Sequence, residues 1–178
     1  MTRTLIPLFL LLCAVAAQAA DIPTHIRNEI SDARLAGQGS FRWFGLKIYD
    51  AELWVEDRDF RPDAPESSRF VLNLTYARDL YGERIARTSI NEIGRLGFGT
   101  LAQRKLWLEQ MEALFPDVHD GTRISGIYLP GQGARFYLNG NPLGEIADSE
   151  FARAFFAIWL DPRTSASSLR NQLLSSAQ

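Results

Sequence analysis

The feature that most constrains the fold is the strand-like stretch at residues 35–55, which reads LAGQGSFRWFGLKIYDAELWV. Apolar and polar residues alternate along it, and a period of two indicates β-structure with one face on a core and one in solvent. The apolar set changes from even to odd positions near Tyr49 and Asp50, which one extra residue, as a bulge or a bend, would produce. Gly37-Gln38-Gly39 lets the backbone turn sharply, so we predict a bent hairpin.

Residues 1–19 are predicted to be a secretory signal peptide. A short basic start with Arg3 precedes an apolar run from Leu5 to Val15, and Ala17-Gln18-Ala19 offers the small residues that a signal peptidase reads. The run is too short to span a membrane. We therefore expect a single exported domain at residues 20–178, periplasmic if the source is bacterial, without stable membrane insertion after cleavage.

Composition argues against several classes of function. The formal charge of −2 is too small to indicate a nucleic-acid partner. The only cysteine, Cys13, lies in the signal peptide, so the mature chain has no thiol for a disulfide or a thiolate metal site. The loop Asp117-Val118-His119-Asp120-Gly121 could present three ligands, but such loops are more often solvated turns, and we predict no metal and no cofactor. No nucleophile motif is present.

The rest of the chain predicts helices and strands in the order of one α+β domain. A charged loop is expected at 56–68, and residues 22–34 form either a short helix or an extended lead-in. Asn139-Gly140 is a strong hairpin signal. Strands are expected at 70–76, 123–129, 134–138 and 143–146, and helices at 83–96, 100–115, 149–160 and 167–174.

Two of the expected helices carry clear start signals. Thr100 and Gln103 have the spacing of a capping box, and Leu101, Leu108 and Phe115 recur on one face of the helix that follows. Asp148 is a good N-cap for the segment FARAFFAIWL, which is apolar nearly all round. Such a helix should be buried on several sides and pack against the sheet.

Three segments resemble the bacterial chalcone isomerase-like proteins, in the order of that family: GQGSFRWFGLKIYDAELWV, the helix pair joined by LGFGT, and ISGIYLPGQGARFYLNGNPLGEIADSEFARAFFAIWLDPRTS. The resemblance covers nearly the whole mature chain. It implies an α+β open-faced sandwich, in which an antiparallel β-sheet packs on a layer of α-helices and a cleft lies between them.

The resemblance also implies two kinds of chemistry for that cleft. In plant members a chalcone closes to a flavanone, assisted by an arginine soon after the Gly-x-Gly, a threonine in the next strand, a tyrosine between glycines at the helix junction, and a Thr or Ser near the C-terminal helix. In fatty-acid-binding members an arginine and a tyrosine meet the carboxylate. Both sets stabilise an anion by charge-assisted hydrogen bonds.

Carried over position by position, the plant set is incomplete. The arginine position falls on Phe41, with Arg42 next to it on a strand whose successive side chains point to opposite faces. Tyr49 stands near the threonine position, and Phe98 stands at the tyrosine position without a hydroxyl. Near the last hydroxyl position lie Thr164 and Ser165.

We weigh three hypotheses for the function. The favoured one is a non-catalytic exported binder of a small amphipathic or apolar ligand such as a fatty acid, with aromatic walls from Phe41, Trp43 and Phe98 and a carboxylate held by Arg42 and Tyr49. The second is an isomerase, an intramolecular lyase of the chalcone–flavanone type acting on a polyphenol-like substrate. The third is a structural protein whose cleft is filled by its own side chains.

Overall fold

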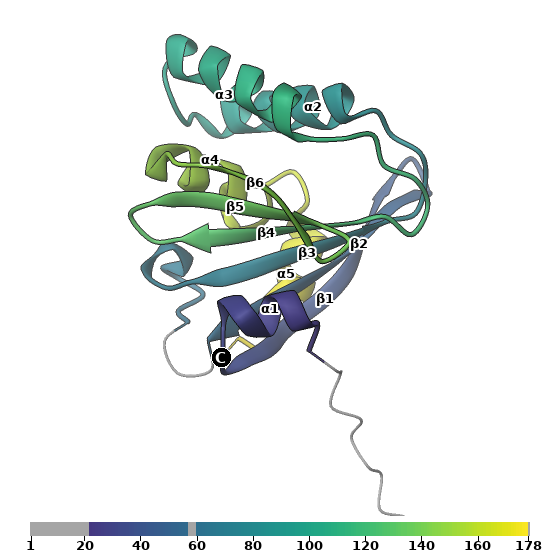
Figure 1. The fold of residues 1–178 in the computed structure, drawn as a ribbon, viewed down its shortest axis with the longest axis vertical. Helices are drawn as coiled ribbons and strands as arrows, with labels where there is room; N and C mark the ends of the chain where they lie inside the picture. The colour runs from purple at the N-terminus through teal and green to yellow at the C-terminus, as the bar shows by residue number, and fades with distance from the viewer. Residues whose placement is uncertain (1–21, 57–59, 178) are drawn as a thin grey trace, which may run out of the picture.

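The computed structural model describes residues 22–56 and 60–177. They form one antiparallel six-stranded sheet whose strands lie side by side in chain order, with helices on both faces (Figure 1). The predicted α+β class is therefore confirmed. The predicted signal peptide at residues 1–19 lies outside the described residues. The strands are β1 (Ala33–Trp43), β2 (Leu46–Glu56), β3 (Phe70–Tyr76), β4 (Arg123–Leu129), β5 (Gly133–Leu138) and β6 (Asn141–Ile146).

The helices divide unequally between the two faces of the sheet. One face carries only α1, Thr24–Glu29, over a small apolar cluster that includes Trp54 and Val71. The other face holds the main core beneath the remaining α-helices. These are α2 (Gly82–Leu96), α3 (Leu101–Leu114), α4 (Ser149–Leu160) and α5 (Ser167–Leu173), while the predicted loop at 56–68 contains a short 3₁₀ helix, η1 (Pro65–Ser67).

The phase change in the first hairpin is a β-bulge. Phe41 pairs with Tyr49, but the next residue, Arg42, pairs with Lys47, so Ile48 is the extra residue on β2. The predicted extra residue is confirmed. Because this extra residue lies on β2, the side chains of β1 alternate regularly from Gly37 to Trp43, beyond a separate bulge at Ala36, and the β2 residues that precede Tyr49 change face.

The two glycines at the start of the hairpin do not make a turn, so that prediction was wrong. Gly37 and Gly39 lie inside β1, and the chain reverses at Phe44–Gly45, where φ is 46° and 80°. A Cβ on Gly37 would lie 2.1 Å from the carbonyl oxygen of Gln172 at the end of α5. Glycine is needed here because the backbone of α5 approaches too closely for a side chain, and not because the chain turns.

Helix α3 begins as predicted but buries a different face. Thr100 and Gln103 form both hydrogen bonds of the capping box. Leu101, however, is 81% exposed, whereas Trp107 is buried and donates its indole N–H to Asp148 at 2.9 Å. Of the predicted face, Phe115 is buried and Leu108 packs against the core, whereas the prediction was wrong for Leu101. The large indole of Trp107, with a buried hydrogen-bond partner, turns the start of the helix toward its own side.

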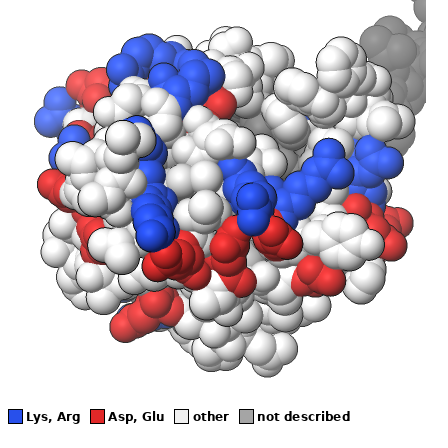
Figure 2. All heavy atoms as spheres, turned by 90° about the horizontal axis from the view of Figure 1, so that it is seen from above, with Lys and Arg blue, Asp and Glu red and all other residues white. Residues whose placement is uncertain are grey.

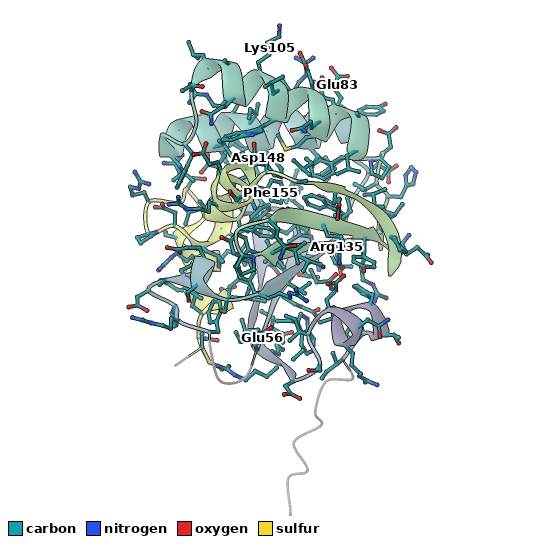
Figure 3. The ribbon with its side chains drawn as sticks, turned by 60° about the vertical axis from the view of Figure 1, so that its left-hand side comes forward. Glu56, Glu83, Lys105, Arg135, Asp148 and Phe155 are labelled. Carbon is teal, nitrogen blue, oxygen red and sulfur yellow. The ribbon has the colours of Figure 1, made fainter. Side chains whose placement is uncertain are left out.

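Helix α4 is the centre of the core. It lies between the sheet and the pair α2–α3, and Phe155 on it points into the interior (Figure 3). The Phe155 ring meets rings from α4 itself, from β5 and from the residue after α3, with centroids 5.3–6.0 Å apart: Phe115, Phe136, Phe151, Phe156 and Trp159. The predicted burial of this helix against the sheet is confirmed.

Asp148 joins the start of α4 to α3 and is the best single test of this packing. Its carboxylate accepts hydrogen bonds from the backbone N–H groups of Glu150 and Phe151 as well as from Trp107. Asp148→Ala should lower the free energy of unfolding by about 1–3 kcal/mol, since a cap is lost and a buried indole N–H is left unpaired. Urea denaturation measures this, with Asp148→Asn as the control that keeps most of the capping.

Acid should weaken the same contacts. Burial alone would raise the pKa of the Asp148 carboxyl, but the hydrogen bonds from Phe151, Trp107 and Glu150 outweigh it and hold the pKa below its usual value. The ionised Asp148 carboxylate therefore stabilises the fold fully at a pH above the pKa that this carboxyl has in the unfolded chain. This stabilisation is lost as the pH falls through the lower pKa of the folded protein. The difference in stability between wild type and Asp148→Asn should therefore shrink on acidification.

Candidate functional site

Two of the predicted site residues meet on the core face of the first hairpin. The rings of Phe41 and Tyr49 stack at 5.2 Å between centroids, and Tyr76 meets Tyr49 edge-on at 5.9 Å. The Tyr49 hydroxyl accepts a hydrogen bond from the indole N–H of Trp159 on α4 at 3.0 Å. Burial raises the pKa of Tyr49 well above its usual value, so this hydroxyl stays neutral. It can still donate one hydrogen bond of its own.

Arg42 lies on the opposite face of the hairpin from Tyr49. It follows Phe41 on a strand with regular alternation, so it shares a face with Ser40 and Asp50. The Arg42 guanidinium donates to the carbonyl oxygen of Gly45 at 3.3 Å. Its charge is also one of the smaller contributions that lower the pKa of Asp50, after the hydrogen bond from Lys47. Arg42 and Tyr49 are therefore not brought together.

The hydroxyls predicted near the C-terminal helix are engaged in local contacts. Thr164 is buried, donates to the carbonyl oxygen of Ile158 and accepts from the N–H of Ala166. Ser165 donates its hydroxyl to the Glu92 carboxylate of α2 at 2.6 Å. These bonds join the loop after α4 to the helix layer. Trp43, the remaining member of the predicted set on the hairpin, is 60% exposed beside the turn.

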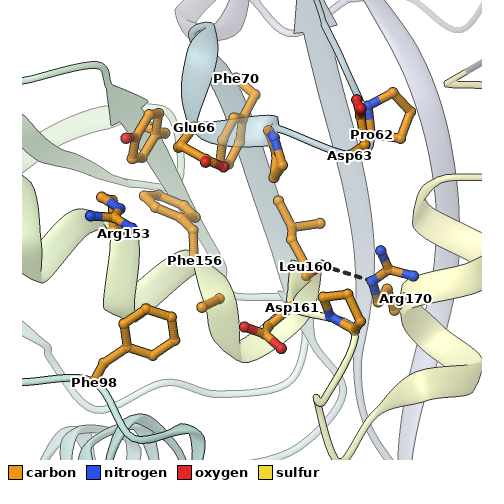
Figure 4. Close-up of a pocket in the computed structure, with 14 residues that line it drawn as sticks. Pro62, Asp63, Glu66, Phe70, Phe98, Arg153, Phe156, Leu160, Asp161 and Arg170 are labelled. Atoms are coloured by element: carbon orange, nitrogen blue, oxygen red, sulfur yellow. Dashed lines mark hydrogen bonds between the residues drawn. The ribbon is translucent and has the colours of Figure 1, made fainter.

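A pocket of about 260 Å³ opens between η1, the start of β3 and helix α4, and Phe98 is the one predicted site residue that lines it (Figure 4). Its apolar surface comes from four aromatic rings together with aliphatic and proline side chains. The apolar lining consists of Pro62, Pro65, Phe70, Phe98, Tyr128, Phe156, Ala157, Leu160 and Pro162.

Two arginines mark opposite ends of this pocket. Figure 4 shows Arg153 beside Phe156 and Arg170 beyond Leu160, with the Arg170 Nε–H donating to the carbonyl oxygen of Leu160 at 2.7 Å. Among the described residues, Arg153 has no ion pair or side-chain hydrogen bond. The Arg153 guanidinium is therefore fully available to a ligand, and the Arg170 guanidinium is available except for its Nε–H.

Tyr128 and Glu66 complete the charged part of the lining. Burial raises the pKa of Tyr128, the negative charge of Glu66 raises it further, and Arg153 opposes the rise. These three groups therefore interact electrostatically across the pocket. The two other acids of the lining are each paired with a neighbouring arginine, Asp63 with Arg61 and Asp161 with Arg163. Glu66 has no such partner among the described residues.

A second hollow of about 300 Å³ continues the pocket along α5. It is lined by Pro62, Arg170, Asn171, Leu174 and Ser175, and it shares its first two residues with the first pocket. Because Pro62 and Arg170 line both hollows, the two lie next to each other, and we call them together the α4–α5 groove.

One feature of the sequence could have indicated this site, namely a single arginine within an apolar helix. Arg153 is the only charged residue in the segment FARAFFAIWL, most of which is buried. A single arginine in an apolar helix has to reach the surface or an anion. The other lining residues come from four separate parts of the chain, and no spacing in the sequence joins them.

The acidic loop considered for a metal is used by the fold. The Asp117 carboxylate accepts the N–H of Gly82 at 2.8 Å, at the first residue of α2, and His119 lies 3.2 Å from Asp79. Within residues 22–56 and 60–177, no three His, Cys, Asp or Glu side chains cluster as metal ligands. In the same ranges, no helix has both the length and the apolar character needed to cross a bilayer.

The Tyr49–Trp159 hydrogen bond can be tested by removing one hydroxyl. Tyr49→Phe leaves the Trp159 indole N–H without its acceptor, so the free energy of unfolding should fall by about 1–3 kcal/mol. Thermal or urea unfolding measures it. Tyr76→Phe is the matched control, because Tyr76 is also buried in the core but has no side-chain hydrogen bond among the described contacts. Equal losses in the two variants would contradict this account of Tyr49.

Comparison with known proteins places this geometry in a family. An uncharacterized protein of Haemophilus influenzae is 31% identical over 139 residues, which span 78% of this chain and 66% of the relative, just under two thirds of its length. The crystal structure of an Arabidopsis thaliana fatty-acid binding protein matches with a TM-score of 0.64 at 14% identity, over 82% of this chain and 88% of that one. The family described as chalcone isomerase-like matches residues 14–175, and the chain belongs to that family.

Proposed function

We propose that the protein is a non-catalytic binder of a small amphipathic acid, such as a fatty acid, and that the α4–α5 groove is its binding site. The observation that carries the proposal is an open, aromatic-lined pocket with an unpaired arginine, Arg153, at one end. An apolar surface with few, well-placed polar groups is the usual form of a small-molecule site. The name of the Arabidopsis neighbour, a fatty-acid binding protein of the same fold, supports the choice of ligand class.

The dimensions of the groove favour a slender ligand. The first pocket, at about 260 Å³, is slightly smaller than the usual range of about 300–1,000 Å³ for ligand sites. Its continuation along α5 past Arg170 adds length. An alkyl chain can follow such a path, whereas a rigid ligand with several fused or linked rings fits it less well.

The charges indicate how a carboxylate would be held. Arg153 can form a charge-assisted hydrogen bond with it, and the Tyr128 hydroxyl, kept neutral by its raised pKa, can donate a second. Glu66 opposes an anion at this end of the pocket. Elsewhere, acidic and basic side chains lie interspersed on the face over α2 and α3 (Figure 2), which supports a small ligand over an extended polyanion.

The isomerase hypothesis has less support. Its polar set would need an arginine beside Tyr49, and Arg42 lies on the other face of the hairpin. The Thr164 and Ser165 hydroxyls already donate to acceptors within the fold, so among the described contacts only the Tyr49 hydroxyl of that set keeps a donor to offer. Oxyanion stabilisation depends on donors that are already aimed at the reacting atoms.

We expect the purified mature protein to cyclise naringenin chalcone no faster than the Arg42→Ala variant does. Absorbance of the chalcone over time measures the reaction, and a buffer blank gives the spontaneous rate. A wild-type rate that clearly exceeds the rates of both the variant and the blank would favour the isomerase hypothesis.

We also propose that the protein acts after export to the periplasm. The support is the basic start, the apolar run from Leu5 to Val15 and the small residues at 17–19. Cell fractionation with mass spectrometry of the N-terminus tests this. A mature N-terminus near Ala20 in the periplasmic fraction is the expected result, and an intact Met1 in the cytoplasm would contradict it.

The charge arrangement predicts opposite effects for two substitutions in the groove. Arg153→Gln should weaken the binding of a medium-chain fatty acid by about tenfold or more, because a charge-assisted hydrogen bond contributes about 1.5–3 kcal/mol. Glu66→Gln should strengthen it, because a repelling charge is removed. Isothermal titration calorimetry or displacement of a fluorescent fatty acid measures both.

Arg84→Gln is the matched control, since it removes an exposed arginine from α2, away from the residues that line the groove. Its affinity should equal that of the wild type. Saturable binding that none of the three substitutions changes would show that the fatty acid binds elsewhere. No detectable binding to the wild type would rule out this ligand class.

A further inference from the structure

The turn of the first hairpin exposes three large apolar side chains next to one another. Trp43 is 60% exposed, Phe44 is 90% exposed and Leu46 is 56% exposed, and the Trp43 and Phe44 rings meet edge-on at 5.1 Å. We call Trp43, Phe44 and Leu46 the hairpin tip. Single exposed apolar residues need no explanation, but contiguous ones mark a surface that is covered in use.

The backbone at the hairpin tip adds a second cost. Phe44 has φ of 46°, in the left-handed region that bulky residues rarely adopt. The same chain builds a similar hairpin turn at Asn139–Gly140 with φ of 50° and 84°, close to the 46° and 80° of Phe44–Gly45. Asn suits this position and Phe does not. Phe44 is thus both strained and exposed, in a turn that Asn-Gly would form with less backbone strain. This combination indicates that Phe44 has a role other than stabilising the fold.

The charges beside the hairpin tip favour one kind of partner. Arg42 and Lys47 pair across the hairpin directly behind it. The nearby Asp50 is already occupied, since it binds Lys47 at 2.7 Å and accepts the hydroxyl of Ser40. Since Lys47 and Asp50 compensate each other, Arg42 leaves one net positive charge behind the apolar side chains of the tip. An anionic lipid surface complements this arrangement, because its acyl chains accept the rings while its headgroups meet the cations.

The shape of the hairpin agrees with a lipid partner. The β1–β2 hairpin runs obliquely across the molecule, and its turn lies at one edge in Figure 1, where the connections between the sheet and α2–α3 cross it in this view. An exposed turn at the edge of the molecule can enter the boundary between headgroups and acyl chains without any change in the fold. Tryptophan is enriched at that depth in membrane proteins.

We propose that the hairpin tip docks the protein on an anionic bilayer surface, with Trp43, Phe44 and Leu46 inserted at the interface and Arg42 and Lys47 on the headgroups. This inference does not depend on the α4–α5 groove or on its ligand. It describes shallow, reversible docking, and it is compatible with the prediction that the mature protein has no stable membrane insertion.

Tryptophan fluorescence of the mature protein with lipid vesicles tests the proposal. Trp43 is exposed while Trp54, Trp107 and Trp159 are buried, so changes in a solvent-exposed signal come from Trp43. With vesicles of phosphatidylglycerol and phosphatidylcholine, the emission should shift to the blue, and brominated lipids should quench it. Vesicles of phosphatidylcholine alone should bind more weakly.

Phe44→Asn is the decisive variant, because it removes the exposed ring and relieves the backbone, so failure to fold is not a concern. It should clearly weaken vesicle binding while its unfolding midpoint stays equal or rises. Arg42→Gln should weaken binding to the anionic vesicles by about fivefold, the effect of one cation near such a surface. Leu106→Gln is the control, since Leu106 is 59% exposed on α3, and it should bind as the wild type does.

Three results would overturn the proposal. The first is the absence of a blue shift or quenching in the wild type. The second is equal weakening by Leu106→Gln and Phe44→Asn, which would indicate non-specific adsorption. The third is a concentration-dependent dimer in light scattering that Phe44→Asn abolishes, because the tip would then be covered by a second copy of the chain. Fatty-acid binding in solution should be the same for wild type and Phe44→Asn, so each proposal can fail alone.

Discussion

Helix α4 has almost no polar side, and a helix of that kind is stable in water only when it is covered all round. The sheet covers one side, α2 and Trp107 of α3 cover a second, and α5 contributes to a third. Asp148 sets where the helix begins and, through Trp107, how α3 lies against it. The position of the helix layer follows largely from this requirement, and so does the groove, since the groove forms where the covering of α4 is incomplete.

Local signals in the sequence were sufficient for most of the elements. The capping box at Thr100, the N-cap Asp148 and the Asn139–Gly140 turn are contacts within a few residues, and each is found as predicted. The errors came from distant contacts. Gly37 is a glycine because the end of α5 approaches it, and α3 buries Trp107 because Asp148 lies opposite. Neither partner is visible in a local pattern.

The candidate groove was beyond sequence reasoning for the same reason. Its lining comes from the segment at 62–70, from Phe98, from Tyr128 and from 153–170, and only the folded chain brings these together. Arg153 was the exception, because a charge in an apolar helix is visible in the sequence itself. The family resemblance indicated the first hairpin instead, and its residues Phe41, Arg42 and Tyr49 line neither hollow of the groove.

The first hairpin shows how the position of a bulge decides which side chains share a face. At the register shift next to Phe41, an extra residue on β1 would have turned Arg42 toward Tyr49. The extra residue there is Ile48 on β2, so Lys47 changes face instead and reaches Asp50. Arg42 then remains with the polar residues of the outer face, and no cation lies beside the Tyr49 hydroxyl in the described contacts. The hydroxyl pairs with Trp159 instead, which joins the hairpin to α4. The position of one inserted residue thus separates an arrangement that could stabilise an anion from one that supports the core.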